Sequence, residues 1–513
     1  MSRYSIVRKA MNFDELIELV SLDQSPGICV DSRAVRQGDI FIAVKGTTCD
    51  GHDFIAQAAA NGARYVVCER NTTYAIGNPA LSEVEWMQYE PVVLDDTAEA
   101  PAILAQAAHG YPASKLTNLA VTGTNGKTTV AFLVRSIIQQ AGSKCGLIGT
   151  VIYDTCSGQS YEASLTTPGC LDIAARQAEM VENGATHMVI EASSHALSQS
   201  RLSQIDFKAA AFTNLAGDHL DYHKTEQDYL AAKTRLFSAL ASDATAVLNR
   251  QSPQAEIIAG KTKARLLWYG IDSRTDLAAH IESMDTSGTV FVMEYAGVSA
   301  TVRTPLLGLY NVSNCLAAGG LCLAAGFDLE TIAAGLSALE AIPGRLEKVE
   351  GADFSVIIDY AHTDDAIKNV LATLKPLCKG NLRVVFGCGG DRDKTKRPRM
   401  ARVAEQLADF VIVTSDNPRT EDPNAIIDDI VTGFAKGPPV RSTDIRNTQY
   451  ATRNTKIVEP DRRKAIKLAI EAAEPDDIVL IAGKGHETYQ IIGTEKSHFS
   501  DKEIAEECLT RVG

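Results

Sequence analysis

A phosphate-binding loop is indicated by seven consecutive residues: Gly123, Thr124, Asn125, Gly126, Lys127, Thr128 and Thr129. An apolar, strand-like stretch precedes them and a helix-like stretch, VAFLVRSIIQQAG, follows them. A loop in this context points backbone N–H groups and the positive end of a helix dipole at a phosphate. We therefore predict that it binds ATP, that Lys127 supplies positive charge, and that Thr128 holds a magnesium ion. The spacing departs from the common GxxxxGK[ST] pattern because Val121 stands in place of the first glycine, but the strand, helix and Lys-Thr-Thr run together disfavour a plain glycine turn.

Two residues with metal-binding side chains follow neighbouring predicted strands. Glu191 ends the strand HMVIE, and His219 lies in NLAGDHLDYH after another strand. A carboxylate and an imidazole at neighbouring strand ends can share a divalent cation, and hard oxygen ligands beside a phosphate loop favour Mg²⁺. The two His and two Asp of DHLDYH leave zinc as a weaker alternative. Lys233 lies in the helix-like stretch EQDYLAAKTRLFSAL, where a lone lysine is most often a surface residue.

Polar motifs follow four strand-like stretches near the C-terminus: DYAH, GCGGDRD, SDNPR and GKGHE. Arg392 and Arg419 lie in two of these motifs, and guanidinium groups match the geometry of carboxylates. Glu487, in the last motif, has the charge that suits an ammonium group. Two cations and one anion at adjacent strand ends describe a pocket for a zwitterion. Separate surface salt bridges are the alternative, and four aligned motifs disfavour it.

Two asparagines lie three residues apart at the start of a further predicted helix, in GLYNVSN. The side chains of Asn311 and Asn314 can hydrogen-bond the edge of a purine. They are equally well explained as helix caps.

The elements that must position these residues indicate an α/β protein of three domains, since 513 residues are too many for one ordinary core. Residues 1–110 show a small α/β pattern. Residues 111–343 are predicted to form a central domain like that of P-loop ATPases. Residues 344–513 alternate strand and helix, as in a Rossmann-like doubly wound parallel sheet. In such sheets ligands bind beyond the carboxyl ends of the strands, where the polar motifs lie.

Composition narrows the partners of the chain. The net charge of -14 disfavours nucleic acid and anionic lipid. The eleven cysteines form no regular pattern, which fits a reducing cytoplasm, and the N-terminus turns acidic where a signal peptide needs apolar residues. The uncharged run 304–327 contains a proline and five glycines, so we expect a buried loop and a core helix there rather than a membrane span. We expect a cytoplasmic monomer that binds small molecules.

The ordered series of motifs resembles the Mur ligase family along essentially the whole chain, and most closely its members that add meso-diaminopimelate. The motifs that carry the resemblance are DSR (31–33), GTNGKTT, LTTP (165–168), EASSHALSQSR, DHLDYH, AAKTRLF, GLYNVSN, PGRLE, DYAHT, GCGGDRD, DNPRTEDP and GKGHE. The resemblance implies that the first domain binds the uridine end of a UDP-sugar peptide, the second binds ATP, and the third binds the incoming amino acid.

Roles for individual residues follow from the same resemblance. It implies that Lys233 is carbamylated and binds Mg²⁺ with Thr128, Glu191 and His219, and that Lys127 completes the catalytic set. The implied contacts to UDP-N-acetylmuramoyl-L-alanyl-D-glutamate are Val30, Ser32, Thr47, Thr48, Cys49, Thr166, Thr167, Ser193, Gln199 and Arg201. Those around ATP include Asn314, Arg345 and Asp359. Those to diaminopimelate are Arg392, Asp416, Asn417, Pro418, Arg419, Gly483 and Glu487.

The reaction implied by the resemblance is ATP-dependent ligation through an acyl phosphate, with closure of the third domain about Pro343-Gly344. Asp364 departs from the family, because it replaces the usual proline after DYAHT. A lysine-adding Mur ligase, a folylpolyglutamate synthetase and a nucleotide-driven switch without ligase turnover are the alternatives. The first is disfavoured by DNPR, the second by DSR and DNPR, and the third by the clustered C-terminal motifs.

Overall fold

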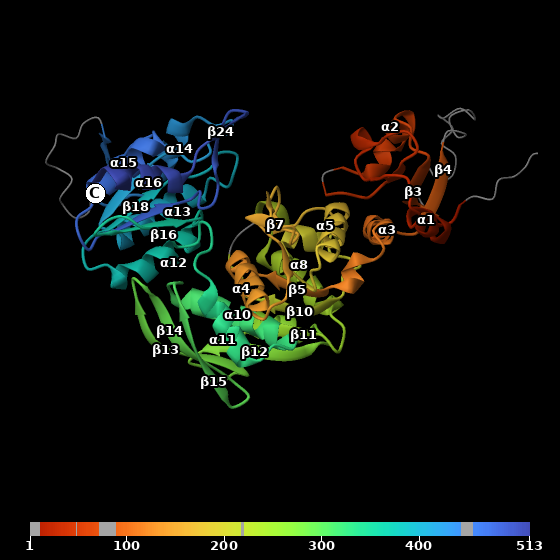
Figure 1. The fold of residues 1–513 in the computed structure, drawn as a ribbon. Coiled ribbons are helices and arrows are strands. Elements are labelled where there is room, and N and C mark those ends of the chain that lie inside the picture. The colour runs from red at the N-terminus through yellow and green to blue at the C-terminus, as the bar shows by residue number, and fades with distance from the viewer. Residues whose placement is uncertain (1–10, 48, 71–88, 217–219, 443–454, 513) are drawn as a thin grey trace, which may run out of the picture.

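A computed structural model describes residues 11–47, 49–70, 89–216, 220–442 and 455–512. Three β-sheets, each packed with helices, follow one another along the chain (Figure 1). The middle sheet lies between the N-terminal and C-terminal ones (Figure 1). The α/β class and the three-domain architecture predicted from the sequence are confirmed, whereas the individual domain boundaries stay a prediction.

The N-terminal sheet contains four parallel strands in the order β1-β2-β3-β4. Alternate residues of β2 point to opposite faces, so that Ile40 and Ile42 join one apolar cluster and Phe41 joins another. The capping box formed by Asn12 and Glu15 fixes the start of the first helix. The elements are α1 (Phe13–Val20), β1 (Ile28–Cys29), β2 (Ile40–Ile42), α2 (Ile55–Ala60), β3 (Tyr65–Glu69), β4 (Glu90–Leu94) and α3 (Ala100–Ala108), with 3-10 turns at Ser32–Ala34 and Gly51–Phe54.

The middle sheet has the order β15-β14-β13-β12-β11-β10-β5-β9-β6-β7-β8, parallel from β13 to β6 and antiparallel at both edges. Its central strands are β5 (Thr117–Thr122), β6 (Cys145–Ile148), β9 (His187–Glu191), β10 (Phe207–Phe212), β11 (Thr245–Asn249) and β12 (Arg265–Ile271). Its remaining strands are β7 (Ile152–Asp154), β8 (Ser160–Glu162), β13 (Leu277–Asp285), β14 (Gly288–Tyr295) and β15 (Val298–Thr304). The 3-10 turn Pro112–Lys115 precedes β5.

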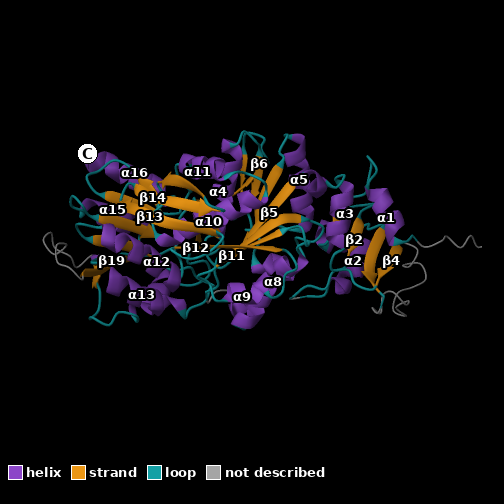
Figure 2. Ribbon diagram, turned by 90° about the horizontal axis from the view of Figure 1, so that it is seen from below, coloured by secondary structure: helices purple, strands orange, loops and turns teal. Residues whose placement is uncertain are grey.

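Helices cover both faces of the middle sheet (Figure 2). One face packs against α4 (Lys127–Gln140), α10 (Leu309–Ala324) and α11 (Leu329–Ala338). The other packs against α5 (Cys170–Glu182), α6 (Ser194–Ser198), α8 (Glu226–Ala239) and α9 (Gln254–Ala259), and the short α7 (Leu220–His223) precedes α8. The buried α10 occupies most of the uncharged run 304–327, which confirms that prediction. Within the described residues no helix is long and apolar enough to cross a membrane.

The C-terminal sheet has the order β16-β17-β22-β18-β19-β21-β20 and is parallel except for β16. Helices on both faces make it doubly wound, as predicted. Its strands are β16 (Glu347–Val349), β17 (Ser355–Asp359), β18 (Leu382–Phe386), β19 (Phe410–Val413), β20 (Val440–Arg441), β21 (Thr455–Val458) and β22 (Ile478–Ala482). The helices are α12 (Asp364–Leu374), α13 (Lys396–Leu407), α14 (Pro423–Val431), α15 (Arg462–Glu471) and α16 (Asp501–Val512), with a 3-10 turn at Lys375–Leu377 and a hairpin of β23 (Tyr489–Ile492) and β24 (Glu495–His498).

Candidate active site

The phosphate loop connects β5 to α4, as the sequence predicts. Gly123 and Gly126 have φ angles of 152° and 90°, which side-chain-bearing residues rarely adopt. The ammonium group of Lys127, the first residue of α4, donates hydrogen bonds to the carbonyls of Gly123 and Thr124, each at 2.9 Å. The loop therefore presents a helix N-terminus and a cation at the carboxyl end of the sheet.

Two segments distant in sequence hold this loop in shape. Asn214 lies in the segment after β10. Its side-chain oxygen accepts a hydrogen bond from the Asn125 amide at 3.0 Å, and its backbone carbonyl accepts one from the Thr124 amide at 2.9 Å. Asn314, which was predicted near ATP, lies against Gly126, where a Cβ atom would collide with its side-chain oxygen. Asn314 also donates to the side chain of Asn311 at 3.1 Å, and the two residues are buried in α10. They are not helix caps, because Gly308 occupies that position.

Glu191 is fully buried at the end of β9, the strand next to β5. One carboxylate oxygen accepts from the Thr150 amide at 2.8 Å. The other accepts from the hydroxyl groups of Thr150, at 2.9 Å, and of Thr128, at 3.1 Å. Thr128 and Glu191 thus bring two hard oxygen ligands together beside the phosphate loop. Thr150 was missed by the sequence analysis, although its place directly after the strand β6 is a signal that could have found it.

Lys233 is not the surface residue that a lone helical lysine usually is, since only 1% of it is exposed. Its ammonium group donates to the Gly123 carbonyl at 2.9 Å and lies 4.3 Å from the centroid of the Tyr229 ring. Lys233 is therefore brought to the phosphate loop, as predicted from the resemblance. His219, which was predicted to join it, lies outside the described residues.

The residues predicted to contact the UDP-sugar peptide in the middle domain form one hydrogen-bonded cluster beside Glu191. The Thr167 hydroxyl lies 2.6 Å from the Glu191 carbonyl and 3.0 Å from the Ser193 hydroxyl. The Arg201 guanidinium donates to the Thr167 carbonyl at 2.8 Å and to the Gln199 side chain at 2.6 Å. Thr166 joins the cluster through the Thr150 hydroxyl, at 3.1 Å.

Tyr222 connects this cluster to the N-terminal domain and was missed by the sequence analysis. Its hydroxyl lies 3.0 Å from that of Ser198 and accepts from Gln199 at 3.2 Å, and the side chain of Thr47 lies close enough to help lower its pKa. Tyr222 lies in the motif DHLDYH, whose His and Asp residues indicated only a metal site. In the N-terminal domain itself, Val30, Thr47 and Cys49 are exposed.

Ser32 and Thr48 complete the predicted residues of the N-terminal domain. Ser32 is 5% exposed, and its hydroxyl donates to Gln57 at 2.8 Å. Ser32 thus supports the turn from within. Thr48 lies outside the described residues.

The segment after Pro343 connects the phosphate loop to the C-terminal domain. The Arg345 guanidinium donates to the Thr128 hydroxyl at 3.3 Å and lies 4.8 Å from the centroid of the Tyr360 ring. Asp359, the last residue of β17, accepts from the amides of Leu346 and Ala361, both at 2.8 Å. Burial raises the pKa of Asp359, and the Arg345 charge opposes this rise. Arg345 therefore reaches the phosphate loop, whereas Asp359 shapes the segment that carries Arg345.

The four polar motifs of the C-terminal domain meet at one edge of its sheet, as predicted, because β17, β22, β18 and β19 are neighbouring parallel strands. Asp416 and Asn417 follow β19 and are buried, at 6% and 4% exposure. Asn417 donates to the Glu487 carboxylate at 2.8 Å. Gly483, after β22, approaches Asp416 so closely that a Cβ atom would lie 2.8 Å from its carboxylate.

Arg419 and Arg392 converge on the same glycine, Gly389. A Cβ atom at Gly389 would lie 2.9 Å from a terminal nitrogen of Arg419 and 3.9 Å from Cγ of Arg392. Arg419 adopts a left-handed backbone with φ of 52°, and its amide donates to the Ile491 carbonyl in the β23–β24 hairpin at 3.1 Å. Its guanidinium donates to the carbonyl of Gly390, next to Pro418. The Arg419 guanidinium and the aliphatic stem of Arg392 thus lie beside Gly389. We call the sheet edge that carries Arg392, Asn417, Arg419 and Glu487 the pocket edge.

The phosphate loop and this pocket edge meet at His486 of the motif GKGHE. The His486 ring lies close enough to Arg345 for the guanidinium charge to act on it, and the Arg345 guanidinium reaches Thr128 of the phosphate loop. Burial, and then the Arg345 charge, lower the pKa of His486 to about 4, so the imidazole is neutral near pH 7. Gly344 packs against the backbone of Gly485 and His486 with a φ of 64°. The two sites therefore face each other across the Pro343-Gly344 segment.

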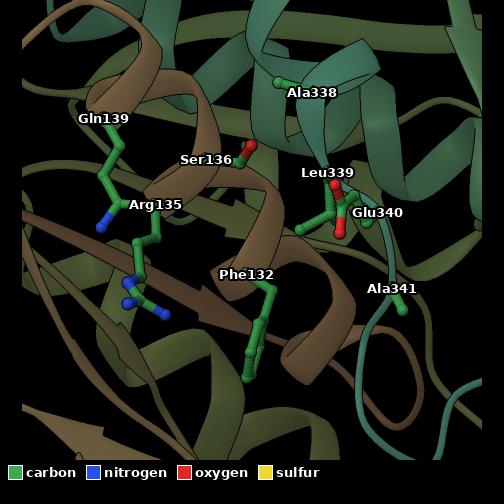
Figure 3. Close-up of a pocket in the computed structure, with 8 residues that line it drawn as sticks. All are labelled: Phe132, Arg135, Ser136, Gln139, Ala338, Leu339, Glu340 and Ala341. Atoms are coloured by element: carbon green, nitrogen blue, oxygen red, sulfur yellow. The ribbon is translucent and has the colours of Figure 1, made fainter. Parts of the chain in front are cut away.

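One hollow of the molecule lies away from this chemistry. A pocket of about 360 Å³ is formed where side chains of α4 meet the segment that follows α11 (Figure 3). Its lining residues on α4 lie in the C-terminal two-thirds of the helix, beyond the phosphate loop. They are Phe132, Arg135, Ser136 and Gln139, and the other wall is Ala338, Leu339, Glu340 and Ala341.

Comparisons with known families cover nearly the whole chain. Family models match in series, as "Mur ligase family, catalytic domain" over residues 26–109, "Mur ligase middle domain" over 121–322 and "Mur ligase, glutamate ligase domain" over 344–485. A curated protein from Geobacillus kaustophilus (strain HTA426), named UDP-N-acetylmuramoyl-L-alanyl-D-glutamate--2,6-diaminopimelate ligase, is 43% identical, and the match covers 94% of this chain and 94% of that protein.

Solved structures agree with this assignment. A structure of a UDP-N-acetylmuramoyl-L-alanyl-D-glutamate--2,6-diaminopimelate ligase is 32% identical, with a TM-score of 0.66 and coverage of 98% of this chain and 99% of that one. Mycobacterium tuberculosis folylpolyglutamate synthase, complexed with ADP and AMPPCP, has a TM-score of 0.59 over 74% of this chain and 91% of its own, but at 20% identity that likeness shows the fold alone. The chain therefore belongs to the Mur ligase family of ATP-dependent ligases.

Proposed function

We propose that this chain joins meso-diaminopimelate to the D-glutamyl residue of UDP-N-acetylmuramoyl-L-alanyl-D-glutamate in cytoplasmic peptidoglycan precursor synthesis, acting as a monomer. The observation that carries the proposal is the position of the Arg419 guanidinium at Gly389, next to the stem of Arg392, on the sheet edge where Asn417 binds Glu487. Diaminopimelate has a second carboxylate that lysine lacks, and guanidinium forks bind carboxylates well. Relatives with the corresponding name support the same choice.

The proposed reaction proceeds through an acyl phosphate. An oxygen of the D-glutamyl side-chain carboxylate attacks the γ-phosphorus of ATP, and ADP leaves with the electrons of the broken P–O bond. The amine of diaminopimelate then attacks the acyl carbon, phosphate leaves, and the nitrogen loses a proton to water. Lys127 places positive charge beside the transferring phosphoryl group, where positioning and electrostatics supply most of the catalysis.

A magnesium ion fits the donors present at the phosphate loop. The Thr128 hydroxyl and the Glu191 carboxylate are hard oxygen ligands that already lie 3.1 Å apart. When bound, the ion would neutralise negative charge on the phosphates. Zinc is less suited to this donor pair, because no soft ligand takes part in it. In the proposal, His219 and Lys233 complete the set.

Lys233 binds the ion only if its charge is inverted, because an ammonium group has no lone pair to offer. We expect carbamylation, in which the neutral amine adds carbon dioxide, loses a proton and becomes a carboxylate-like group. Rigorous removal of bicarbonate and carbon dioxide should then lower turnover, and adding bicarbonate should restore it. Turnover that is indifferent to bicarbonate, together with an unmodified Lys233 by mass spectrometry, would contradict this part of the proposal.

The nucleotide-linked acceptor is proposed to lie against the cluster of Thr166, Thr167, Ser193, Gln199 and Arg201. That cluster surrounds Glu191 and is connected through Tyr222 to Thr47 of the N-terminal domain. A peptide bound there has its carboxylate beside the phosphate loop while its uridine end extends toward Val30, Ser32 and Cys49.

One assay tests the choice of amino acid. ATP-dependent phosphate release is measured with the UDP-sugar dipeptide and either meso-diaminopimelate or L-lysine. The proposal expects turnover that requires both the dipeptide and meso-diaminopimelate. A preference for L-lysine would move the chain to the lysine-adding ligases, turnover with folate and glutamate would make it a folylpolyglutamate synthetase, and phosphate release independent of any acceptor would make it a nucleotide switch.

Closure of the C-terminal domain about Pro343-Gly344 is part of the proposal, because the amine bound in one domain must reach an intermediate formed in the other. The hydrogen bond from Arg345 to Thr128 is a contact expected of a closed arrangement. Small-angle scattering should report a more compact protein with an ATP analogue and dipeptide than without them. Identical profiles would exclude a closing motion of that size.

A further inference from the structure

Lys484 is a fully buried lysine at the centre of the C-terminal motifs, and none of the roles above uses it. It follows β22 directly, and its side chain has an exposure of 0%. Its ammonium nitrogen lies 3.1 Å from the side-chain oxygen of Asn417, 3.2 Å from a Glu487 carboxylate oxygen and 3.8 Å from an Asp416 carboxylate oxygen. A buried ammonium group is costly unless it is paired, so its surroundings explain why it is tolerated.

Lys484 lies against three of the residues that are proposed to receive the amino-acid substrate, Asp416, Asn417 and Glu487. Asn417 accepts from Lys484 and from the Ile491 amide, at 3.0 Å, through the same oxygen. This fixes which end of the amide is the donor, and that donor points at Glu487 at 2.8 Å. One carboxylate oxygen of Glu487, Oε2, accepts hydrogen bonds from both Asn417 and Lys484. Within the described residues the other oxygen accepts no hydrogen bond.

Among the charges that act on Glu487, that of Lys484 has the largest effect in favour of its ionised form. Burial raises the pKa of Glu487, the Lys484 charge opposes this rise, and Asp416 adds to it. Arg462 of α15 also acts on Glu487, but its guanidinium is held by Asp501 at 2.7 Å, with both side chains fully buried. Tyr360 and Tyr489, the other titratable groups whose charge interacts with Glu487, have raised pKa values and are neutral near pH 7.

We propose that Lys484 is a positioning residue that holds Asn417 and Glu487 in the orientation, and Glu487 in the charge state, that receive the ammonium group of the incoming amino acid. Asp416 and Glu487 bring two carboxyl groups against the single ammonium of Lys484, so the cluster can receive the ammonium group of the substrate. This inference rests on the proposed function, because it takes Glu487 to be the substrate's partner. Lys484 itself is fully enclosed and does not touch the substrate.

The test compares Lys484→Met, which keeps the length of the side chain, with Lys484→Arg, which keeps the charge. Loss of the charge should raise the KM for meso-diaminopimelate by about 10-fold or more, as expected for a hydrogen bond to a charged group. The KM for ATP should change by less than about 2-fold, since the phosphate loop is untouched.

A pH profile adds a readout that a merely structural role would not move. The substrate ammonium requires ionised Glu487, and loss of the Lys484 charge raises the pKa of that carboxyl. The acidic limb of kcat/KM for meso-diaminopimelate should therefore move to higher pH in Lys484→Met and remain near the wild-type position in Lys484→Arg. Adding Glu487→Gln to Lys484→Met should abolish the shift, because the titrating group is gone.

Lys456→Met is the matched control, because Lys456 is another buried lysine of the same domain. Its ammonium lies 2.7 Å from Glu405, and neither residue belongs to the motifs at the pocket edge. Lys456→Met should lower the melting temperature without changing the KM for meso-diaminopimelate selectively. Wild-type turnover with meso-diaminopimelate tests the proposed function separately, and if L-lysine is the substrate the same comparison is made with L-lysine.

The outcomes are distinct. A selective rise in amino-acid KM with the displaced acidic limb supports the inference. An unchanged KM and pH profile in Lys484→Met, or equal losses toward ATP and amino acid that Lys456→Met reproduces, overturns it. If Lys484→Met does not fold, Lys484→Arg decides, because its bulkier head displaces Asn417 and Glu487 and must raise the amino-acid KM while leaving the ATP KM and the pH profile in place.

Discussion

The phosphate loop and the amino-acid pocket edge are built in opposite ways. The loop is one contiguous segment, Gly123–Thr129, whose backbone and helix dipole do most of the binding, with Lys127 as the added charge. The pocket edge is assembled from the ends of four strands, between Asp359 and Glu487, and depends on side-chain charges that lie far apart in sequence. The loop therefore depends on the neighbouring segments that hold its backbone in shape, whereas the pocket edge depends on each partner that fixes a charge.

The charges of the two regions also differ in how they are supported. Lys127 and Lys233 donate to backbone carbonyls of the loop itself. In the pocket edge, an ion pair between buried Arg397 and partly exposed Glu421 supports the segment that carries Arg419. Hydrogen bonds from Arg397 and the Asp391 amide lower the pKa of Glu421 to about 2. Substitutions at the loop should therefore affect phosphoryl transfer, and those at the pocket edge should affect the choice of amino acid.

Lys127→Met should have the largest effect and should affect every acceptor equally. Removing the charge beside the transferring phosphoryl group is expected to lower kcat by about 1000-fold, as for loss of a preorganised electrostatic contact. The measurement is phosphate release with meso-diaminopimelate and, separately, with any weaker amino acid that supports turnover. A loss restricted to one amino acid would show that Lys127 acts in the pocket and not at the phosphates.

Arg419→Ala should impair use of the amino acid without affecting the phosphate loop. Loss of a charge-assisted carboxylate contact is expected to lower kcat/KM for meso-diaminopimelate by about 100-fold, while binding of an ATP analogue stays unchanged. Discrimination against L-lysine should narrow, because lysine never used that contact. Arg399→Ala is the control, since Arg399 pairs with Asp364 on a half-exposed surface of the same domain. Weakened ATP-analogue binding in Arg419→Ala would refute the assignment.

The sequence predicted the buried strands and the sheet edge at which they end, but not the contacts that depend on residues from several segments. The buried Val and Ile runs of β17, β18, β19 and β22 indicated strands, and parallel strands must present their carboxyl ends at one edge. The antiparallel strands β13 to β15 were missed, although GTVFVMEY alternates in burial and carried the signal. Lys484 could not be found by periodicity, because its burial depends on Asp416, Asn417 and Glu487 arriving from other segments.

His486 is partly buried beside Arg345, and its neutral state makes the stability of the protein pH-dependent. Its folded-state pKa of about 4 lies below the ordinary histidine value, so the unfolded chain takes up a proton at higher pH than the folded chain. The stabilisation is complete above the ordinary value and declines as the pH falls toward 4. When the pH falls from about 7.5 to 5.5, protonation of the unfolded chain at His486 should lower the unfolding free energy of the wild type by about 1 kcal/mol. His486→Gln should not show this part of the decrease. Equal pH slopes in urea titrations of the two proteins would contradict this.

Asp364→Pro should have the smallest effect. It tests whether the replacement of the family's usual proline by Asp364 changes stability or ATP binding. Asp364 is the first residue of α12, where a proline is well accommodated, and the preceding Thr363 is extended, as a residue before proline must be. The substitution removes the ion pair with Arg399, at 3.1 Å, which is partly exposed. The gain and loss should cancel to within about 0.5 kcal/mol in urea unfolding, with the KM for ATP unchanged. A tighter KM for ATP in this variant would mean that the aspartate weakens nucleotide binding, and that the pocket edge extends its influence to the phosphate loop.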